Sequence, residues 1–231
     1  MTARRWEPGP KLTPKVIIEG TRLTHKTDLA FALNDFEPFI GPRRYRYHAP
    51  LVSAAWGAFT PYPWGRGLID FDPAERALAM EAYATWARLF ELHRYYSWVV
   101  DRFHLSTLAW QRIHGRRDED FGWLEERLEP LGFHVVLCTR RAETFEAARA
   151  DRLSVSGKPD QYDDLDVFLR EQTVLRALAG DSRLPVLEID MSDGDVARAC
   201  TESAEWMVRT GGLWAPGPPE GVVDDGPGDQ T

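Results

Sequence analysis

Cysteine is scarce in this chain of 231 residues, which has only Cys138 and Cys200, far apart in the sequence. A disulfide framework or a cysteine-rich zinc site is therefore not expected, and both residues are interpreted as reduced thiols of a cytoplasmic protein. Long apolar runs are missing too. None approaches membrane-spanning length, and no signal-peptide core follows the two arginines near the N-terminus. We expect no membrane partner.

Basic residues are outnumbered, since 28 lysines and arginines stand against 36 aspartates and glutamates and give a formal net charge of −8. Such a surface repels nucleic acid as a whole, although a local basic pocket can still hold a small anion. We therefore expect a small-molecule partner and no nucleic acid, and the sequence leaves a homodimer open. The six histidines show no metal-ligand spacing, and the Gly-x-Ser-x-Gly signature of a serine hydrolase is absent.

Hydrophobic residues make up 43% of the chain, which is enough for a sizeable core. Proline, glycine and polar residues dominate both ends, so we expect a flexible N-terminus over 1–13 and a disordered tail over 215–231. Between them, over 14–214, short apolar runs alternate with amphipathic stretches, the pattern of βαβ units. This predicts one α/β domain built on a parallel sheet.

The apolar runs and capping signals place the individual elements. Strong strands are predicted over 15–19, 97–101, 133–139 and 184–190, and a weak one over 39–40 would make about five. The sequence Asp72-Pro73-Ala74-Glu75 predicts a capped helix start, with the helix running to about residue 95. The spacing predicts that one face of this helix carries Leu78, Ala82, Trp86, Leu89 and His93. Other helices are predicted over 26–34, 105–113, 121–128, 143–152, 165–178 and 195–210.

A loop with a phosphate-binding pattern follows the first predicted strand. It consists of Gly20, Thr21, Arg22, Leu23, Thr24, His25, Lys26 and Thr27. The pattern is Gly, four residues, then Gly-Lys-Ser/Thr, and His25 occupies the second glycine, where a side chain adds steric cost. Backbone N–H groups and the helix N-terminus would cradle phosphates, Lys26 would reach the β- and γ-phosphates, and Thr27 would ligate Mg²⁺. The alternative is a coincidental Lys-Thr pair at a helix start.

A second motif begins within the second strong strand and continues past it: Trp98-Val-Val-Asp101-Arg102-Phe103-His-Leu-Ser106-Thr-Leu-Ala109-Trp110-Gln111. P-loop proteins hold Mg²⁺, or orient an acceptor, with an acidic residue at this place. The segment resembles the Asp-Arg-Tyr/Phe, Ser, Ala-Tyr-Gln signature of thymidylate kinases and related nucleoside kinases. Glu19-Gly20 and the helix-then-strand stretch 72–101 resemble the same family. In element order the resemblance covers about 15–210.

The resemblance implies a three-layer P-loop NTPase fold of class α/β, with about five parallel strands, helices on both faces and an Arg-rich lid at about 141–163. It further implies a kinase that moves the γ-phosphoryl group of ATP, with Mg²⁺, to a nucleoside monophosphate or nucleoside. Lys26 and Thr27 take the ATP and Mg²⁺ roles, Asp101 lies beside the metal and acceptor, and Arg102 grips the acceptor's phosphate or sugar. Gln111 either approaches the acceptor base or is a solvated helix residue.

Arginine clusters complete the expected site. Arg43, Arg44 and Tyr45 stand where the family has an Arg-containing loop for the acceptor phosphate; the alternative is a solvated basic loop. Arg149 and Arg152, three residues apart on one helix face, correspond to lid arginines that neutralise the transferring phosphoryl group. The alternative for that pair is a surface helix whose Glu143 and Glu146 pair with the arginines.

The family carries an acidic residue where Arg22 stands. An arginine inside the loop either supplies transition-state charge or is a surface residue of a loop without catalytic duty. Two function classes follow. The first is an ATP-dependent phosphotransferase acting on a nucleotide, nucleoside or similar acceptor. The second is a non-catalytic nucleotide-binding or partner-binding module whose phosphate loop has degenerated at His25.

Overall fold

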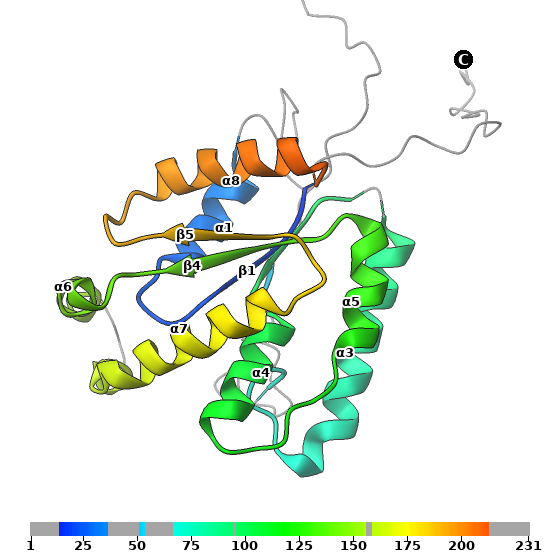
Figure 1. Ribbon diagram of the computed structural model, residues 1–231, viewed down its shortest axis with the longest axis horizontal. Helices are drawn as coiled ribbons and strands as arrows, with labels where there is room; N and C mark the ends of the chain where they lie inside the picture. The colour runs from blue at the N-terminus through cyan, green and yellow to red at the C-terminus, as the bar shows by residue number, and fades with distance from the viewer. Residues whose placement is uncertain (1–13, 37–50, 54–66, 95, 156–158, 213–231) are drawn as a thin grey trace, which may run out of the picture.

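The computed structural model describes residues 14–36, 51–53, 67–94, 96–155 and 159–212. Within these ranges the chain forms one sheet of five parallel strands in the order β2-β3-β1-β4-β5 (Figure 1). The strands are β1 (Lys15–Gly20), β2 (Leu51–Ser53), β3 (Trp98–Asp101), β4 (His134–Thr139) and β5 (Val186–Asp190). The predicted fold class and strand number are confirmed. The fifth strand is β2, while the predicted strand at 39–40 lies outside the described residues.

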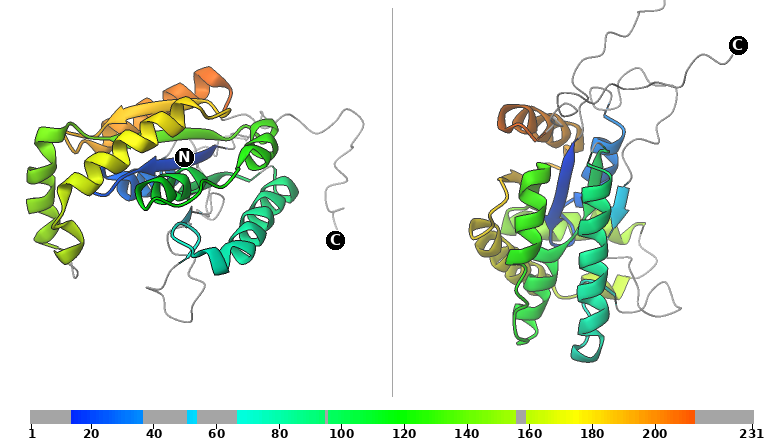
Figure 2. Two further views of the ribbon diagram at one scale, coloured as in Figure 1. Left: turned by 60° about the horizontal axis from the view of Figure 1, so that its bottom comes forward. Right: turned by 90° about the vertical axis from the view of Figure 1, so that its right-hand side faces the viewer.

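Helices cover both faces of the sheet and give the three layers. One face carries α1 (Lys26–Asn34) and α8 (Val196–Thr210). The other carries α3 (Arg76–Leu92), α4 (His104–Ile113), α5 (Gly122–Leu128) and α7 (Leu165–Gly180), and Figure 2 shows α3 and α5 side by side. The described residues also form short 3₁₀ helices that join the larger elements: η2 (Pro73–Glu75), η3 (Glu129–Leu131), η4 (Ala142–Thr144) and η5 (Pro159–Tyr162). In the described part of the chain, no helix has the length and apolarity that a membrane crossing requires.

The central strand β1 is buried along its whole length, because it has helices on both sides. Ile17 packs into the core under α3, α4, α5 and α7, whereas Val16 and Ile18 pack into the core under α1 and α8. Alternate side chains of a strand point to opposite faces, so a strand buried on both faces needs a continuous apolar run. That requirement explains the Val-Ile-Ile sequence.

The helix that begins near Asp72 has the predicted cap but a different buried face. Asp72 N donates to Glu75 Oε2 at 2.7 Å, and the capping box is complete. The buried stripe of α3 is Ala79, Tyr83, Ala87 and Phe90, whereas Leu78 is 48% exposed. Of the predicted face, Ala82, Trp86 and Leu89 are partly buried against this core, while Leu78 points away from it. The Tyr83 and Phe90 rings pack edge-to-face on Phe103, which fixes the rotation of the helix.

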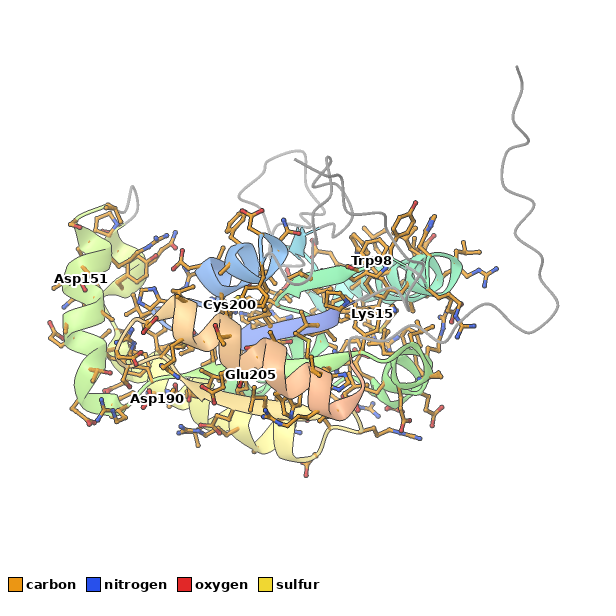
Figure 3. The ribbon with its side chains drawn as sticks, turned by 90° about the horizontal axis from the view of Figure 1, so that it is seen from above. Lys15, Trp98, Asp151, Asp190, Cys200 and Glu205 are labelled. Atoms are coloured by element: carbon orange, nitrogen blue, oxygen red, sulfur yellow. The ribbon has the colours of Figure 1, made fainter. Side chains whose placement is uncertain are left out.

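Because all five strands are parallel, their carboxyl ends meet at one edge of the sheet. Asp190, the last residue of β5, lies toward that edge with Asp151 of α6 (Phe145–Leu153), whereas Lys15 and Trp98, the first residues of β1 and β3, lie at the opposite side (Figure 3). Ligands of open α/β sheets bind beyond the carboxyl ends of the strands. The residues that follow β1, β3 and β4 are thus the ones to search for a site.

Candidate functional site

The turn from β1 into α1 has the tight geometry that its first glycine permits. Gly20 has φ 150°, and a Cβ there would lie 2.6 Å from the carbonyl oxygen of Cys138 on the neighbouring strand β4. Thr24 Oγ1 donates to the Thr21 carbonyl at 2.8 Å and closes the loop. Lys26, the first residue of α1, donates from Nζ to the same carbonyl at 3.3 Å. The lysine therefore lies back over the loop, as a lysine that contacts bound phosphates must.

His25 has the backbone conformation that the missing glycine would supply. It is the N-cap of α1, with φ 52° and ψ 19° in the left-handed region, and its Nδ1 lies 3.0 Å from Asp28 Oδ2. A residue other than glycine costs about 1–2 kcal/mol there. The chain bears this strain, and the backbone enters α1 through a left-handed residue without glycine.

Two oxygen ligands of the kind that Mg²⁺ prefers meet beside the loop. Thr27 Oγ1, in the first turn of α1, donates to Asp101 Oδ2, at the end of β3, at 2.8 Å. The two residues are 74 positions apart in sequence and are brought together because β3 is the parallel neighbour of β1. A hydroxyl and a carboxylate, with nucleotide phosphates and water, fit the coordination of Mg²⁺. Among the described residues no group of three His, Cys, Asp or Glu could hold a metal ion alone.

The ammonium of Lys26 lies within reach of several charges at this edge. Burial, and then the charge of Arg102, lower the pKa of Lys26 to about 8, against the opposing effect of Asp101 and Glu171. The charge of Arg22 lowers this pKa as well, so three cations and two anions lie within interaction range next to the loop. A bound polyphosphate would add negative charge close to Lys26 and favour its protonated form.

Glu171, on α7, is a site residue that the sequence did not indicate. Its Oε1 accepts a hydrogen bond from Arg102 Nη1 at 3.2 Å, and its Oε2 accepts one from the hydroxyl of Thr21. Arg102 has a left-handed backbone with φ 63°, and its N–H donates to the Ile18 carbonyl at 2.9 Å. The carboxylate thus joins the phosphate loop to the arginine predicted to grip the acceptor.

Glu19, just before the loop, is wholly buried and ties the two motifs together. Its Oε1 accepts from the backbone N–H of Phe103 at 2.9 Å and of Ser106 at 3.3 Å, and its Oε2 accepts from the Ser106 hydroxyl. Burial raises the pKa of Glu19, while these hydrogen bonds and the charge of His104 oppose the rise. Glu19 therefore fixes the start of α4 relative to the phosphate loop.

The predicted lid corresponds to α6 and η5, next to the loop. Arg149 pairs with Glu146 at 3.5 Å and with Asp163 at 3.3 Å, and Arg152 Nε donates to the Tyr162 hydroxyl at 3.0 Å. The hydrogen bond from His25 lowers the pKa of Asp28 against the opposing effect of burial, and the charges of His25 and Arg152 add to the lowering. Arg149 and Arg152, predicted as lid arginines, are thus bonded within their own segment, and Arg149 makes the pairing with Glu146 that the surface-helix alternative expects. Arg152 lies close to the first turn of α1.

Two arginines connect the loop to the lid side of the molecule. Arg22 Nη1 donates to Gln161 Oε1 of η5 at 2.5 Å. Arg140, which follows β4, is 4% exposed and donates from Nε to the Leu23 carbonyl at 2.9 Å and from Nη1 to the Ser192 carbonyl at 3.3 Å. Arg140 therefore supports the loop by binding its backbone. The sequence could not show this role, because Arg140 stands next to Arg141 and is indistinguishable there from a lid arginine.

Gln111, expected either to approach an acceptor base or to be a solvated helix residue, is buried near the end of α4, which excludes the solvated position. Its Oε1 accepts from the Glu119 N–H at 2.9 Å. That hydrogen bond fixes the segment that follows α4. Arg43, Arg44 and Tyr45 lie outside the described residues. The structure therefore brings together Lys26, Thr27, Asp101, Arg102 and the newly identified Glu171, with Arg152 nearby.

Comparisons with known proteins agree with this architecture. No protein-family model matches the chain, and no curated protein is significantly similar to it. Among solved structures, the YorR protein of Bacillus subtilis, in complex with phosphorylated GDP, has a TM-score of 0.55 and 14% identity over 87% of this chain and 99% of that one. Thymidylate kinase from Ehrlichia chaffeensis has a TM-score of 0.51 and 14% identity, over 85% and 98% of the two chains. The chain has a nucleotide kinase-like P-loop fold.

Proposed function

We propose that this protein is an ATP-dependent, Mg²⁺-requiring phosphotransferase whose acceptor is a nucleoside monophosphate or a nucleoside-like molecule. The observation that carries the proposal is the 2.8 Å hydrogen bond between Thr27 and Asp101, with Lys26 over the same loop. A hydroxyl, a carboxylate and a lysine in this arrangement are what a P-loop kinase needs around Mg²⁺ and the β- and γ-phosphates. The similarity to two nucleotide-related structures supports the same reading.

In the proposed reaction, an oxygen of the acceptor forms a bond to the γ-phosphorus of ATP. The bond from that phosphorus to the β–γ bridging oxygen breaks, ADP leaves with the electron pair, and an alcohol acceptor releases its proton to solvent. Mg²⁺, held by Thr27 and Asp101, would neutralise charge on the phosphates when bound. Lys26 binds and orients them, and Arg102 positions the acceptor. Catalysis of this kind rests on positioning and electrostatics, so Lys26 and Arg102 matter more than any nucleophile.

The experiment is a thermal-shift panel of nucleoside triphosphates with Mg²⁺, crossed with nucleosides and their monophosphates, followed by assays of ADP formation. ATP with Mg²⁺ should stabilise the wild-type protein and not Lys26→Ala. Arg170→Ala, which removes an exposed cation from α7, is the matched control and should respond as the wild type does. Equal stabilisation of wild type and Lys26→Ala would eliminate the P-loop function. ATP binding without transfer to any acceptor would favour the non-catalytic nucleotide-binding module.

A further inference from the structure

Glu171 occupies a position between the two halves of the proposed site. Its carboxylate accepts hydrogen bonds from Thr21 in the phosphate loop and from Arg102 after β3, and the Glu171 and Arg102 side chains are each 13% exposed. Charge-assisted hydrogen bonds in such a partly buried place are stronger than exposed ones. Glu171 is therefore a fixed part of the site and is not a surface carboxylate that happens to be near.

Hydrogen bonds and packing of the neighbouring residues hold both Glu171 and Arg102 in place. The next residue along α7, Gln172, is buried, accepts from the Arg140 N–H at 2.7 Å and donates to the Arg140 carbonyl at 2.8 Å. Phe168 and Leu175 of the same helix are buried too. On the other side, the N–H of Arg102 is bonded to Ile18. Neither element can withdraw from the other without breaking buried contacts.

The pairing changes which acceptor the arginine can hold. A phosphate monoester carries close to two negative charges at neutral pH. Placed on the Arg102 guanidinium, it would meet a carboxylate that is already within hydrogen-bond distance of that group, and Asp101 lies close by as well. Like charges brought together in a partly desolvated site weaken binding. An alcohol carries no charge, and its hydroxyl can donate to the carboxylate.

We infer, on the basis of the proposed function, that Glu171 is a specificity-determining residue that makes the acceptor site select an uncharged, nucleoside-like alcohol over a phosphate monoester. Arg102 then acts as the partner that holds the carboxylate and donates to the alcohol's oxygen. Of the two proposed acceptor classes, nucleoside monophosphates and nucleoside-like molecules, this inference selects the second.

The test compares wild type, Glu171→Gln, Arg102→Met and the double variant, with Asp166→Asn as a control that removes an exposed carboxylate from the same helix. Calorimetry measures the binding of nucleosides and of the matching 5′-monophosphates in the presence of ADP and Mg²⁺. Wild type and Asp166→Asn should bind a nucleoside at least about tenfold more tightly than its monophosphate, and Glu171→Gln should remove or invert that preference. A wild-type preference for monophosphates that survives in Glu171→Gln would overturn the inference.

A titration with inorganic phosphate separates this inference from the proposed function, because it requires neither ATP binding nor turnover. Glu171→Gln should bind phosphate about tenfold more tightly than wild type does, and the gain should vanish when Arg102→Met is added. No gain, or a gain that persists in the double variant, would refute the role of Glu171 even in an active kinase. A gain in phosphate affinity that depends on Arg102 would support the role of Glu171 even if the protein failed to bind ATP. Thermal unfolding of each variant, measured alongside, establishes that the compared proteins are folded.

Discussion

The hydroxyl of Thr27 and the carboxylate of Asp101 are joined by a 2.8 Å hydrogen bond across two neighbouring parallel strands. Thr27 ends the phosphate-loop motif and Asp101 ends β3, so the bond exists only because β1 and β3 are adjacent and end at the same edge. Under the proposed function, the bond holds together the two side chains that would ligate Mg²⁺. The pair therefore makes the metal dependence of nucleotide binding the first property to measure.

Asp101→Asn should weaken ATP binding in the presence of Mg²⁺ by about 10–100-fold, because the amide retains the shape of the side chain but loses the charge that the cation requires. Binding of ATP in EDTA should change little. Isothermal titration with and without Mg²⁺ measures both. Asp190→Asn, which neutralises an exposed carboxylate at the end of β5, should behave as wild type in both buffers. An equal loss in Mg²⁺ and in EDTA would show that Asp101 acts on the loop and not on the metal.

Lys26 should make ATP binding pH-dependent. Burial and the charge of Arg102 lower the pKa of Lys26 to about 8, and phosphates favour its protonated form, so binding near pH 8 should take up a proton and affinity should fall as the pH rises above 8. Folding stability without ATP should depend on pH in the opposite direction. The lysine pKa is lower in the folded state, so the contribution of Lys26 to the free energy of unfolding rises as the pH increases from about 8 toward the ordinary pKa of 10.5.

Calorimetry in buffers of different ionisation enthalpy measures the proton uptake by Lys26 directly. Lys26→Arg carries a charge that does not titrate in this range, so its ATP affinity, although reduced, should be flat between pH 7 and pH 9. A slope of the same size in both proteins would assign the pH dependence to another group.

The sequence predicted most of the strands and helices that carry this site. The strand before Gly20 and the bounds of α1, Lys26–Asn34, agree with the structure because a buried β1 needs a continuous apolar run and a helix start has strong local signals. The pairing of β1 with β3 puts Thr27 next to Asp101. Because β2 lies between these two strands in the sequence, their adjacency came from the resemblance to P-loop kinases and not from the order of the elements.

The features that could not be predicted depend on distant contacts. Glu171 is one acidic residue on an amphipathic helix, and only the packing of α7 over the sheet brings it to Thr21 and Arg102. The three-residue strand β2 is too short to produce a pattern. In α3, two neighbouring apolar stripes satisfy the same period, and the aromatic contacts of Tyr83 select one of them. Burial in each case is decided by tertiary packing.

A buried pair away from the site should control stability at low pH. Glu125 of α5 lies 2.8 Å from His104 Nε2 and accepts further bonds from Ser182 and the Arg183 N–H. Burial would raise the pKa of Glu125, but the hydrogen bonds from His104, Arg183 and Ser182 outweigh it and lower the pKa to about 2. The stabilisation is therefore complete above the ordinary pKa of 4.5 and is lost as the pH falls toward 2.

Glu125→Gln should accordingly lower the free energy of unfolding by about 3 kcal/mol at pH 7, and the difference from wild type should shrink between pH 4.5 and pH 2. Urea unfolding at several pH values measures it. Glu126→Gln, on the same helix, breaks only an exposed pair with Arg183 and should cost less than about 1 kcal/mol. A constant difference across this pH range would mean that the charge of Glu125 is not what stabilises the fold.

The last prediction concerns His25, which decides between a working phosphate loop and a degenerate one. His25→Gly removes the strain of a left-handed residue, worth about 1 kcal/mol, and loses the exposed contact with Asp28, worth about 0.5 kcal/mol, so stability should be equal or slightly higher. ATP binding should be equal or tighter, because the backbone N–H groups can approach the phosphates more closely. His25→Ala is the matched variant: it keeps the strain, loses the contact, and should be less stable than His25→Gly by about 1 kcal/mol. Urea unfolding and ATP calorimetry on the three proteins measure these differences. A fall in turnover in His25→Gly, with a changed pH profile and unchanged ATP affinity, would instead give the imidazole a positive role in the reaction.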